Sequence, residues 1–265
     1  FNLSLKDFDS CNIEKSKPKS LAALYALGRI SDIYDRIKIY SKSDSLNLGV
    51  AAFSSFITFK EKKNTEFNFC KNPLNFIAIS NLKSQINDYE FFNNDLINEL
   101  KKIKSSWEPS GKTTIKGFQS NPNLFDNPKG RLKDLKSAII REIDLYKLKF
   151  KNENCAFIEK WPLKKNFACW YVILKKQGHQ NAHIHPNGWL SGVVYLKTLP
   201  NLKKDEGAIE FSLNSDHYFD LNSPKRLHQP IIGDIVLFPS SLHHRTIPFL
   251  ANTDRISIAF DLVPI

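Results

Sequence analysis

Cysteine, methionine and long apolar runs are scarce or missing, and these shortages exclude several classes of protein. The four cysteines among 265 residues lie far apart without a CxxC pair. This spacing argues against a disulfide scaffold or a structural zinc site and favours a reducing compartment, so we expect a cytoplasmic protein. Because no run of about 18 apolar residues occurs, the sequence predicts no transmembrane helix and no membrane partner. The chain begins at Phe1 without a signal-peptide pattern, and we expect a trimmed N-terminus, which leaves an earlier leader open.

Arginine is also scarce, since only seven of the 38 basic residues are Arg. The charge is uneven: residues 1–178 hold 31 basic and 19 acidic residues, a net +12, whereas residues 179–265 hold seven and eight, a net −1. Proteins that read bases or phosphates directly are usually richer in arginine. We therefore favour a solvated lysine-rich surface over one that steers an acidic protein or nucleic acid. A nucleic-acid partner is not favoured. The sequence does not indicate the oligomeric state.

Apolar residues and histidines are what the sequence does contain. It is 42% hydrophobic and 12% aromatic, which is enough for a packed core and excludes a disordered chain. All seven histidines lie within residues 179–265. Neutral imidazole is the commonest metal ligand. The C-terminal part is therefore where we expect the chemistry.

Helical periodicity dominates the first half of the chain. Apolar residues at steps of three and four predict an amphipathic helix over residues 20–42, and a second helix is expected after Ser45. These two form a helical hairpin, at most one degenerate helical repeat. Residues 94–106 predict a short helix, 107–130 a loop and 131–149 a long helix whose apolar stripe should cover the outer face of a sheet.

The pattern changes near residue 153, where short β-branched and aromatic runs follow one another, separated by Gly, Pro or Asn. Many short strands of this kind indicate a jelly roll. We therefore expect an α+β protein with a helical N-terminal region over 1–110 and a second domain over 111–265, whose β core starts at about 153. The expected strands are CAFIEKW, FACWYVILKK, WLSGVVYLK, GAIEFSL, QPIIGDIVLFP, HHRTIPFL and RISIAFDLVP.

Two histidine segments are candidates for a metal site. His183 and His185 are two residues apart, so on a strand both side chains would face one way and reach one ion. Equally, they could be surface residues in a loop before a buried strand. The segment FPSSLHHRTIPF places His243 and His244 where a returning strand could bring one of them to that pair. The alternative is a polar rim after a core strand.

The last expected strand, RISIAFDLV, has two different faces. Alternation puts Ile256, Ile258 and Phe260 on a core face and Arg255 and Ser257 on the opposite one. An Arg beside a hydroxyl can form a bidentate carboxylate clamp. Taken alone, an Arg on the solvent face of an edge strand is the better interpretation.

Together the segments HIHPNGWLSGVVYL, LFPSSLHHRTIPF and RISIAFDL resemble the iron(II)/2-oxoglutarate-dependent oxygenases, and within them a family of bacterial and phage oxygenases. The resemblance covers about residues 115–265. It implies a double-stranded β-helix of the jelly-roll, cupin-like kind as the catalytic module. It also implies Fe(II), 2-oxoglutarate and O₂ as cofactor and cosubstrates, and hydroxylation of an unactivated C–H bond with formation of succinate and CO₂.

The resemblance also implies roles for single residues. His183 and His244 fall on the two histidine ligands, and His185 falls where most members have the carboxylate ligand. Arg255 and Ser257 fall on the pair that binds the distal carboxylate of 2-oxoglutarate. We expect Asn181, Asn187 and Trp189 to line the substrate pocket, and the substrate to be a peptide side chain or a small molecule, with a nucleobase left open.

The middle ligand departs from the family pattern. The usual iron set is two histidines and one carboxylate, so three neutral imidazoles leave the site one negative charge short. We favour His185 as the third ligand. The alternative is that water or a displaced carboxylate takes this place, and the candidate carboxylates are Asp216, Asp220 and Asp234. A three-His cupin-like metalloenzyme without 2-oxoglutarate and a non-catalytic jelly-roll binding module are the alternatives to an oxygenase, and three histidines could also hold zinc.

Overall fold

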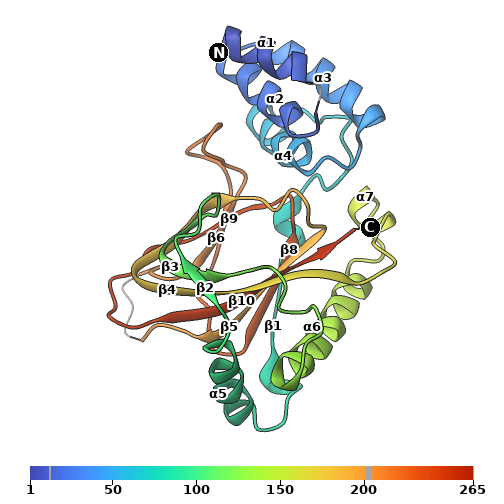
Figure 1. Ribbon diagram of the computed structural model, residues 1–265. Coiled ribbons are helices and arrows are strands. Elements are labelled where there is room, and N and C mark those ends of the chain that lie inside the picture. Colours follow the sequence, from blue (N-terminus) through green and yellow to red (C-terminus); the bar gives the residue numbers. More distant parts are fainter. Residues whose placement is uncertain (12, 201–203, 265) are drawn as a thin grey trace.

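The computed structural model, which describes residues 1–11, 13–200 and 204–264, places a group of N-terminal helices beside a curled antiparallel sheet (Figure 1). No described helix has the length and apolar character that a membrane crossing needs. All four cysteines are free thiols. The N-terminal helices are α1 (Asn2–Cys11), α2 (Ser16–Ala26), α3 (Ile30–Ser43) and α4 (Leu48–Glu61).

The continuous helix expected over residues 20–42 was wrong, because the chain breaks between α2 and α3. Gly28 has φ = 71°, a backbone conformation that a side chain disfavours. The Gly28 amide donates to Tyr25 O and the Arg29 amide to Leu24 O. These two hydrogen bonds form a helix-ending glycine motif, which the apolar periodicity across Gly28 does not reveal.

α4 joins the helices to the rest of the protein. The Asn47 side chain accepts a hydrogen bond from the Val50 amide and so caps its first turn. Tyr218, from a loop of the β-module, packs edge-on against Phe53, with 4.9 Å between ring centroids, and at a tilt against Phe56, with 4.7 Å between centroids. Lys60 forms an ion pair with Asp220 from the same loop. The helices and the β-module therefore share one core.

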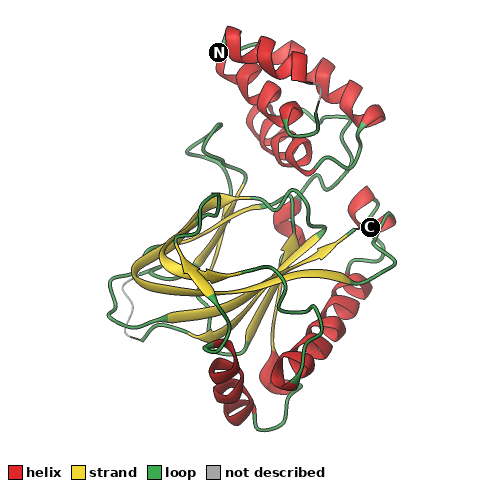
Figure 2. Ribbon diagram, viewed as in Figure 1, coloured by secondary structure: helices red, strands yellow, loops and turns green. Residues whose placement is uncertain are grey.

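The sheet has the strand order β1-β8-β5-β10-β4-β9-β6-β7, and β3, which also pairs with β2, joins it through β4. The 18-residue strand β4 pairs with β10 along its first part, and near its end pairs His183 with His244 of β9. The sheet thereby curls over itself (Figure 2), which confirms the expected jelly-roll double-stranded β-helix. The strands are β1 (Ala78–Asn81), β2 (Ser105–Trp107), β3 (Thr114–Ser120), β4 (Asn166–His183), β5 (Leu190–Lys197), β6 (Ile209–Ser212), β7 (Lys225–His228), β8 (Asp234–Pro239), β9 (His243–Thr246) and β10 (Arg255–Val263).

A division into helices before residue 153 and strands after it proves too simple. β1 lies within the region expected to be helical, yet it pairs with β8, and β3 lies within the expected loop 107–130. The segment CAFIEKW, expected as a strand, contains the short helix α7 (Ala156–Glu159). A short apolar run does not distinguish a strand from a buried helical turn. The helix expected over 94–106 is α5 (Tyr89–Leu100), which begins and ends earlier.

The long helix α6 (Gly130–Lys149) has the predicted bounds within one residue. Its buried residues join one core cluster with Ile256, Ile258 and Phe260, which form the outer face of β10. Two hydrogen bonds hold its inner side: Ser80 of β1 donates to Glu142 at 2.5 Å, and the Tyr146 hydroxyl donates to Phe76 O at 2.7 Å. The opposite face of β10 is therefore free to line the interior of the curled sheet.

Candidate metal site

Three histidines from the end of β4, the segment that follows it and the start of β9 lie close together. His183 is the last residue of β4, His185 follows it by two, and His244 pairs with His183 across the β4–β9 ladder. Their candidate ligand nitrogens all lie within 4.8 Å of one another. The ring centroids of His183 and His244 are 4.3 Å apart, and each lies 5.0 Å from that of His185. The structure thus brings together the three histidines that the sequence singled out.

The protonation of the three rings suits a metal. A carbonyl oxygen only accepts hydrogen bonds, so Nδ1 of His183, 2.6 Å from Asn181 O, and Nδ1 of His244, 3.2 Å from Leu242 O, carry the hydrogens. The His185 Nδ1 lies 2.6 Å from the Asp261 carboxylate, which is likewise an acceptor. Each ring therefore keeps the lone pair of Nε2 for an ion.

Burial keeps two of the rings neutral. Desolvation, followed by the neighbouring His185, lowers the pKa of His183 to about 3. Burial also lowers the pKa of His244 well below its ordinary value, with His183 and His185 adding to the effect. Neutral imidazole is the form that binds metals. Near neutral pH these rings are thus in their metal-binding form.

Arg255 lies on the inner face of the same barrel. In the ladders of β10 with β4 and β5, Ser257 stands opposite Val172 and Tyr195, so these residues share the inward face with Arg255. Arg255 is 2% exposed, its guanidinium carbon lies 4.9 Å from the Tyr195 ring centroid, and burial lowers its pKa. Ser257, the other predicted anion ligand, is 3% exposed.

Several buried donors on this inner face lack partners. Arg255 Nε, the Tyr195 hydroxyl and Trp170 Nε1 have no hydrogen-bond partner among the described residues. Trp170 belongs to the same face, because it stands opposite Ala259, and its ring centroid lies 5.6 Å from that of His185. An unpaired buried cation and two unpaired donors are costly unless an anion satisfies them. The interior beside the histidines is therefore chemically suited to a carboxylate.

The expected substrate-pocket residues occupy different positions. Asn187 lines a cavity beside His183. Asn181 contributes its backbone carbonyl to the His183 ring. Trp189 lies in the core instead, where its indole N–H donates to Phe157 O at 3.0 Å and its ring packs on Phe69 and Phe157. Trp189 therefore lies against α7 in the core and does not line the cavity beside His183.

The residues next to the triad are engaged elsewhere. His243 turns away from the other rings and contacts the Tyr218 ring at 5.8 Å. Of the carboxylates considered as a third ligand, Asp220 pairs with Lys60, and Asp234 accepts hydrogen bonds from His228 and Asn81. Asp216 is exposed and lines the cavity beside His183. Among the described residues, the metal-sized cluster of His, Cys, Asp and Glu side chains consists of the three histidines.

A cavity of about 490 Å³ lies between the helices and the end of β4, where it reaches His183 but not His185 or His244. Its walls come from both parts of the chain and include Lys15, Lys19, Leu46, His183, Asn187 and Tyr218.

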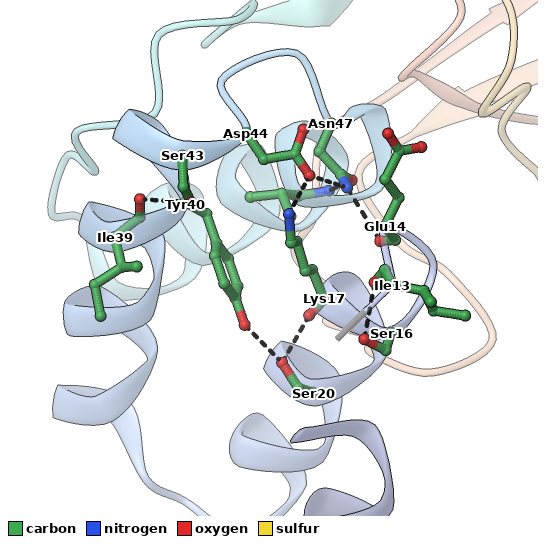
Figure 3. A network of polar contacts seen from close by, with 11 residues as sticks. Ile13, Glu14, Ser16, Lys17, Ser20, Ile39, Tyr40, Ser43, Asp44 and Asn47 are labelled. Carbon is green, nitrogen blue, oxygen red and sulfur yellow. Dashed lines mark hydrogen bonds and ion pairs between the residues drawn. The ribbon is translucent and has the colours of Figure 1, made fainter. Parts of the chain in front are cut away.

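The helical wall of this cavity is held by a polar network (Figure 3). Lys17 pairs with Asp44 at 2.6 Å, and the Asn47 amide donates to Asp44 at 3.0 Å and to Glu14 O at 3.1 Å. These contacts tie the start of α2 to the α3–α4 connection. The helical region thus shapes the space in front of His183.

Sequence reasoning missed Trp170, Tyr195 and Asp261 as parts of the site. A signal was present for two of them: alternation in RISIAFD puts Asp261 on the same strand face as Arg255, and alternation in FACWYVIL puts Trp170 on the same face as Val172. The register of three strands was needed to show that these faces coincide. Only the pairing of β10 with both β4 and β5 brings the residues together.

Comparison with known proteins adds a family and a fold. Residues 168–261 match the family described as "Putative 2OG-Fe(II) oxygenase". Two solved structures resemble the fold with a TM-score of 0.50: a Pseudomonas putida prolyl-4-hydroxylase, 12% identical and covering 71% of this chain and 92% of its own, and a Trichoplax adhaerens prolyl hydroxylase in complex with a peptide fragment, 15% identical and covering 73% and 86%. No curated protein matches the sequence.

Proposed function

We propose that residues 168–261, which match the family of putative 2OG-Fe(II) oxygenases, form an oxygenase domain that acts as a hydroxylase and holds its iron with His183, His185 and His244. The family match and the fold confirm the resemblance that the three sequence motifs carried. The observation that supports the site assignment most is the convergence of one ring nitrogen from each of three histidines, in a barrel that also holds a buried, incompletely paired arginine.

The residues fit both groups that such an oxygenase uses. Nε2 of the three histidines would hold Fe(II), and Arg255, with Ser257 and Tyr195 beside it, would bind the distal carboxylate of 2-oxoglutarate. When bound, iron and 2-oxoglutarate supply the oxidation of a C–H bond by O₂, with release of succinate and CO₂. The protein's own contribution is to orient the cosubstrate and to exclude water from the inner face of the barrel.

Arg255 orients the cosubstrate in two ways. Its cation neutralises a carboxylate in a place where water does not reach, since it is 2% exposed. Arg255 begins β10, and Asp261, six residues further along the same face, lies beside His185. A cosubstrate held by Arg255 would therefore extend along this face toward the histidines. Trp170, beside His185, limits the space on the β4 side.

We infer that the substrate occupies the cavity between the helices and His183. Glu14, Lys15 and Lys19 from the helical region and Asp216 from the segment between β6 and β7 give this cavity both charges, and its remaining lining includes apolar side chains. A peptide side chain or a small molecule of mixed polarity would suit that lining. The helical region then takes part in substrate choice, and its excess of lysine need not bind nucleic acid.

The function is tested by succinate formation. Purified protein is incubated with Fe(II), 2-oxoglutarate and O₂ across a panel of peptides and small molecules, and succinate is quantified. The expected result is iron-dependent succinate formation that one substrate class stimulates and that His183→Ala abolishes. Metal binding without any 2-oxoglutarate consumption would favour the three-His cupin-like metalloenzyme. The absence of metal binding would favour the binding module.

A further inference from the structure

The three-histidine site raises a question of charge. A facial set of two histidines and one carboxylate brings one negative charge to the metal. His183, His185 and His244 bring none. A buried divalent ion with only neutral ligands is less stabilised than one beside an anion. A compensating carboxylate should therefore lie close to one of the rings.

Asp261 is that carboxylate. Its Oδ1 lies 2.6 Å from Nδ1 of His185, the ring that stands where the family pattern has its acidic ligand. The Asp261 side chain is 11% exposed and that of His185 is 13% exposed, so water screens the pair little. Of the three Nδ1 partners, Asp261 is the only charged group, because His183 and His244 donate to backbone carbonyls.

A buried hydroxyl network fixes the carboxylate. The Ser191 hydroxyl donates to Asp261 Oδ1 at 2.6 Å and lies 3.1 Å from His185 Nδ1. Ser240 lies 2.8 Å from Ser191, and both serines are almost fully buried. Asp261 and Ser191 face each other across the β10–β5 ladder, so two rigid strands hold this group.

We propose that Asp261 acts through His185 to supply the negative charge that the three-histidine shell lacks, a role that rests on the proposed iron site. Asp261 accepts the Nδ1 hydrogen, which fixes the ring with Nε2 toward the metal and makes that nitrogen a stronger donor. His185 and Asp261 together then replace the usual acidic ligand. Counted over both residues, the site carries the same net charge as two histidines and one carboxylate.

Asp261 is a positioning residue, so its test needs a measurement other than turnover. The probe is the metal alone: affinity for Co²⁺ and Fe²⁺ under anaerobic conditions, and the Fe(III)/Fe(II) potential of the loaded protein. Asp261→Asn keeps the shape and an acceptor oxygen but removes the charge. We expect it to lower metal affinity by about 10–100-fold, as loss of such outer partners does, and to raise the potential, because an anion near the metal favours Fe(III).

Two variants and a double mutant separate this role from a structural one. Asp261→Glu restores the charge and should recover part of the affinity and the potential. Asp216→Asn removes a carboxylate from the cavity wall without touching His185 and should leave both unchanged. In a His185→Ala background, Asp261→Asn should have little further effect, since the two residues act as one unit.

The outcomes distinguish the proposal from the proposed function. Equal metal affinity and potential in wild type and Asp261→Asn would overturn the role of Asp261 and leave the iron site intact. An equal loss in Asp216→Asn would show a general charge effect and overturn it as well. Wild type that binds neither metal would overturn the iron site and this inference together.

A measurement without any variant covers the case in which Asp261→Asn does not fold. Nitrogen NMR of the histidine rings in zinc-loaded wild-type protein should show His185 bound through Nε2 with Nδ1 protonated. Metal bound through Nδ1 of His185 would exclude the contact with Asp261 and overturn the proposal.

Discussion

Arg255 is the residue whose substitution tests the oxygenase site most directly. Its guanidinium is 2% exposed, and its Nε has no partner among the described residues. In the complex, Arg255 would satisfy the distal carboxylate of 2-oxoglutarate. Removal of one partner from a buried ion pair costs about 3–5 kcal/mol. At about 1.4 kcal/mol per tenfold change, Arg255→Ala should weaken 2-oxoglutarate binding by roughly two to three and a half orders of magnitude.

The same burial predicts an opposite effect on the ligand-free protein. A buried cation without a carboxylate is costly, and replacement of buried charges by apolar side chains of similar volume is often neutral or stabilising. Arg255→Met should therefore leave the unfolding temperature of the ligand-free protein unchanged or raise it, while it abolishes cosubstrate binding. Arg255→Lys should recover only part of the affinity, because lysine is a point charge without the planar fork.

The assay is calorimetric titration of 2-oxoglutarate into anaerobic, metal-loaded protein, for wild type and each variant. Metal affinity serves as the internal control and should not change, because Arg255 lies on the inner face of β10 and outside the histidine cluster. Equal 2-oxoglutarate affinities in wild type and Arg255→Ala would refute the clamp and favour a three-His metalloenzyme without this cosubstrate.

Three further predictions concern the metal, the junction with the helices and the break in the helical region. His244→Ala should abolish Co²⁺ binding in a titration, whereas His243→Ala, at a position equally buried but outside the cluster, should retain it. Tyr218→Ala should lower the free energy of unfolding in urea by about 3–5 kcal/mol, as for other buried aromatic rings, and Tyr218→Phe should lower it much less. Gly28→Ala should cost about 1–2 kcal/mol because a side chain disfavours the left-handed backbone, and an unchanged melting temperature would contradict the assigned conformation.

The sequence predicts the elements whose chemistry is local. The 20-residue helix α6 and the alternating strand β10 both follow from their apolar periods, and the HxH spacing places His183 and His185 near each other. The sequence did not predict the helix break at Gly28 or the helix α7. A local backbone motif and a short buried helical turn leave no signal in the apolar periodicity. β1 was missed for another reason: its pairing with β8 joins residues more than 150 positions apart.

The candidate site divides in the same way. Its candidate metal and anion ligands were singled out because three short motifs together resemble a known family. Asp261 and Tyr195 were not, although alternation gives each an inward direction, because their roles depend on which strands become neighbours. Ser191 and Asp261 face each other only once β5 and β10 pair in one register. A one-residue slip would turn the whole set to the other face.

The proposed arrangement also places cosubstrate and substrate in different parts of the protein. The donors suited to 2-oxoglutarate, Arg255 and Tyr195, belong to the inward faces of β10 and β5, whereas the cavity beside His183 is bounded by α2 and the segment before α4. Neither Arg255 nor Tyr195 lines that cavity. Substitutions in the helical wall, such as at Lys19 or Leu46, should therefore change substrate choice and leave 2-oxoglutarate and metal affinity intact. Under this proposal the helical region, which the oxygenase motifs do not cover, takes part in substrate choice, because it forms one wall of the cavity beside His183.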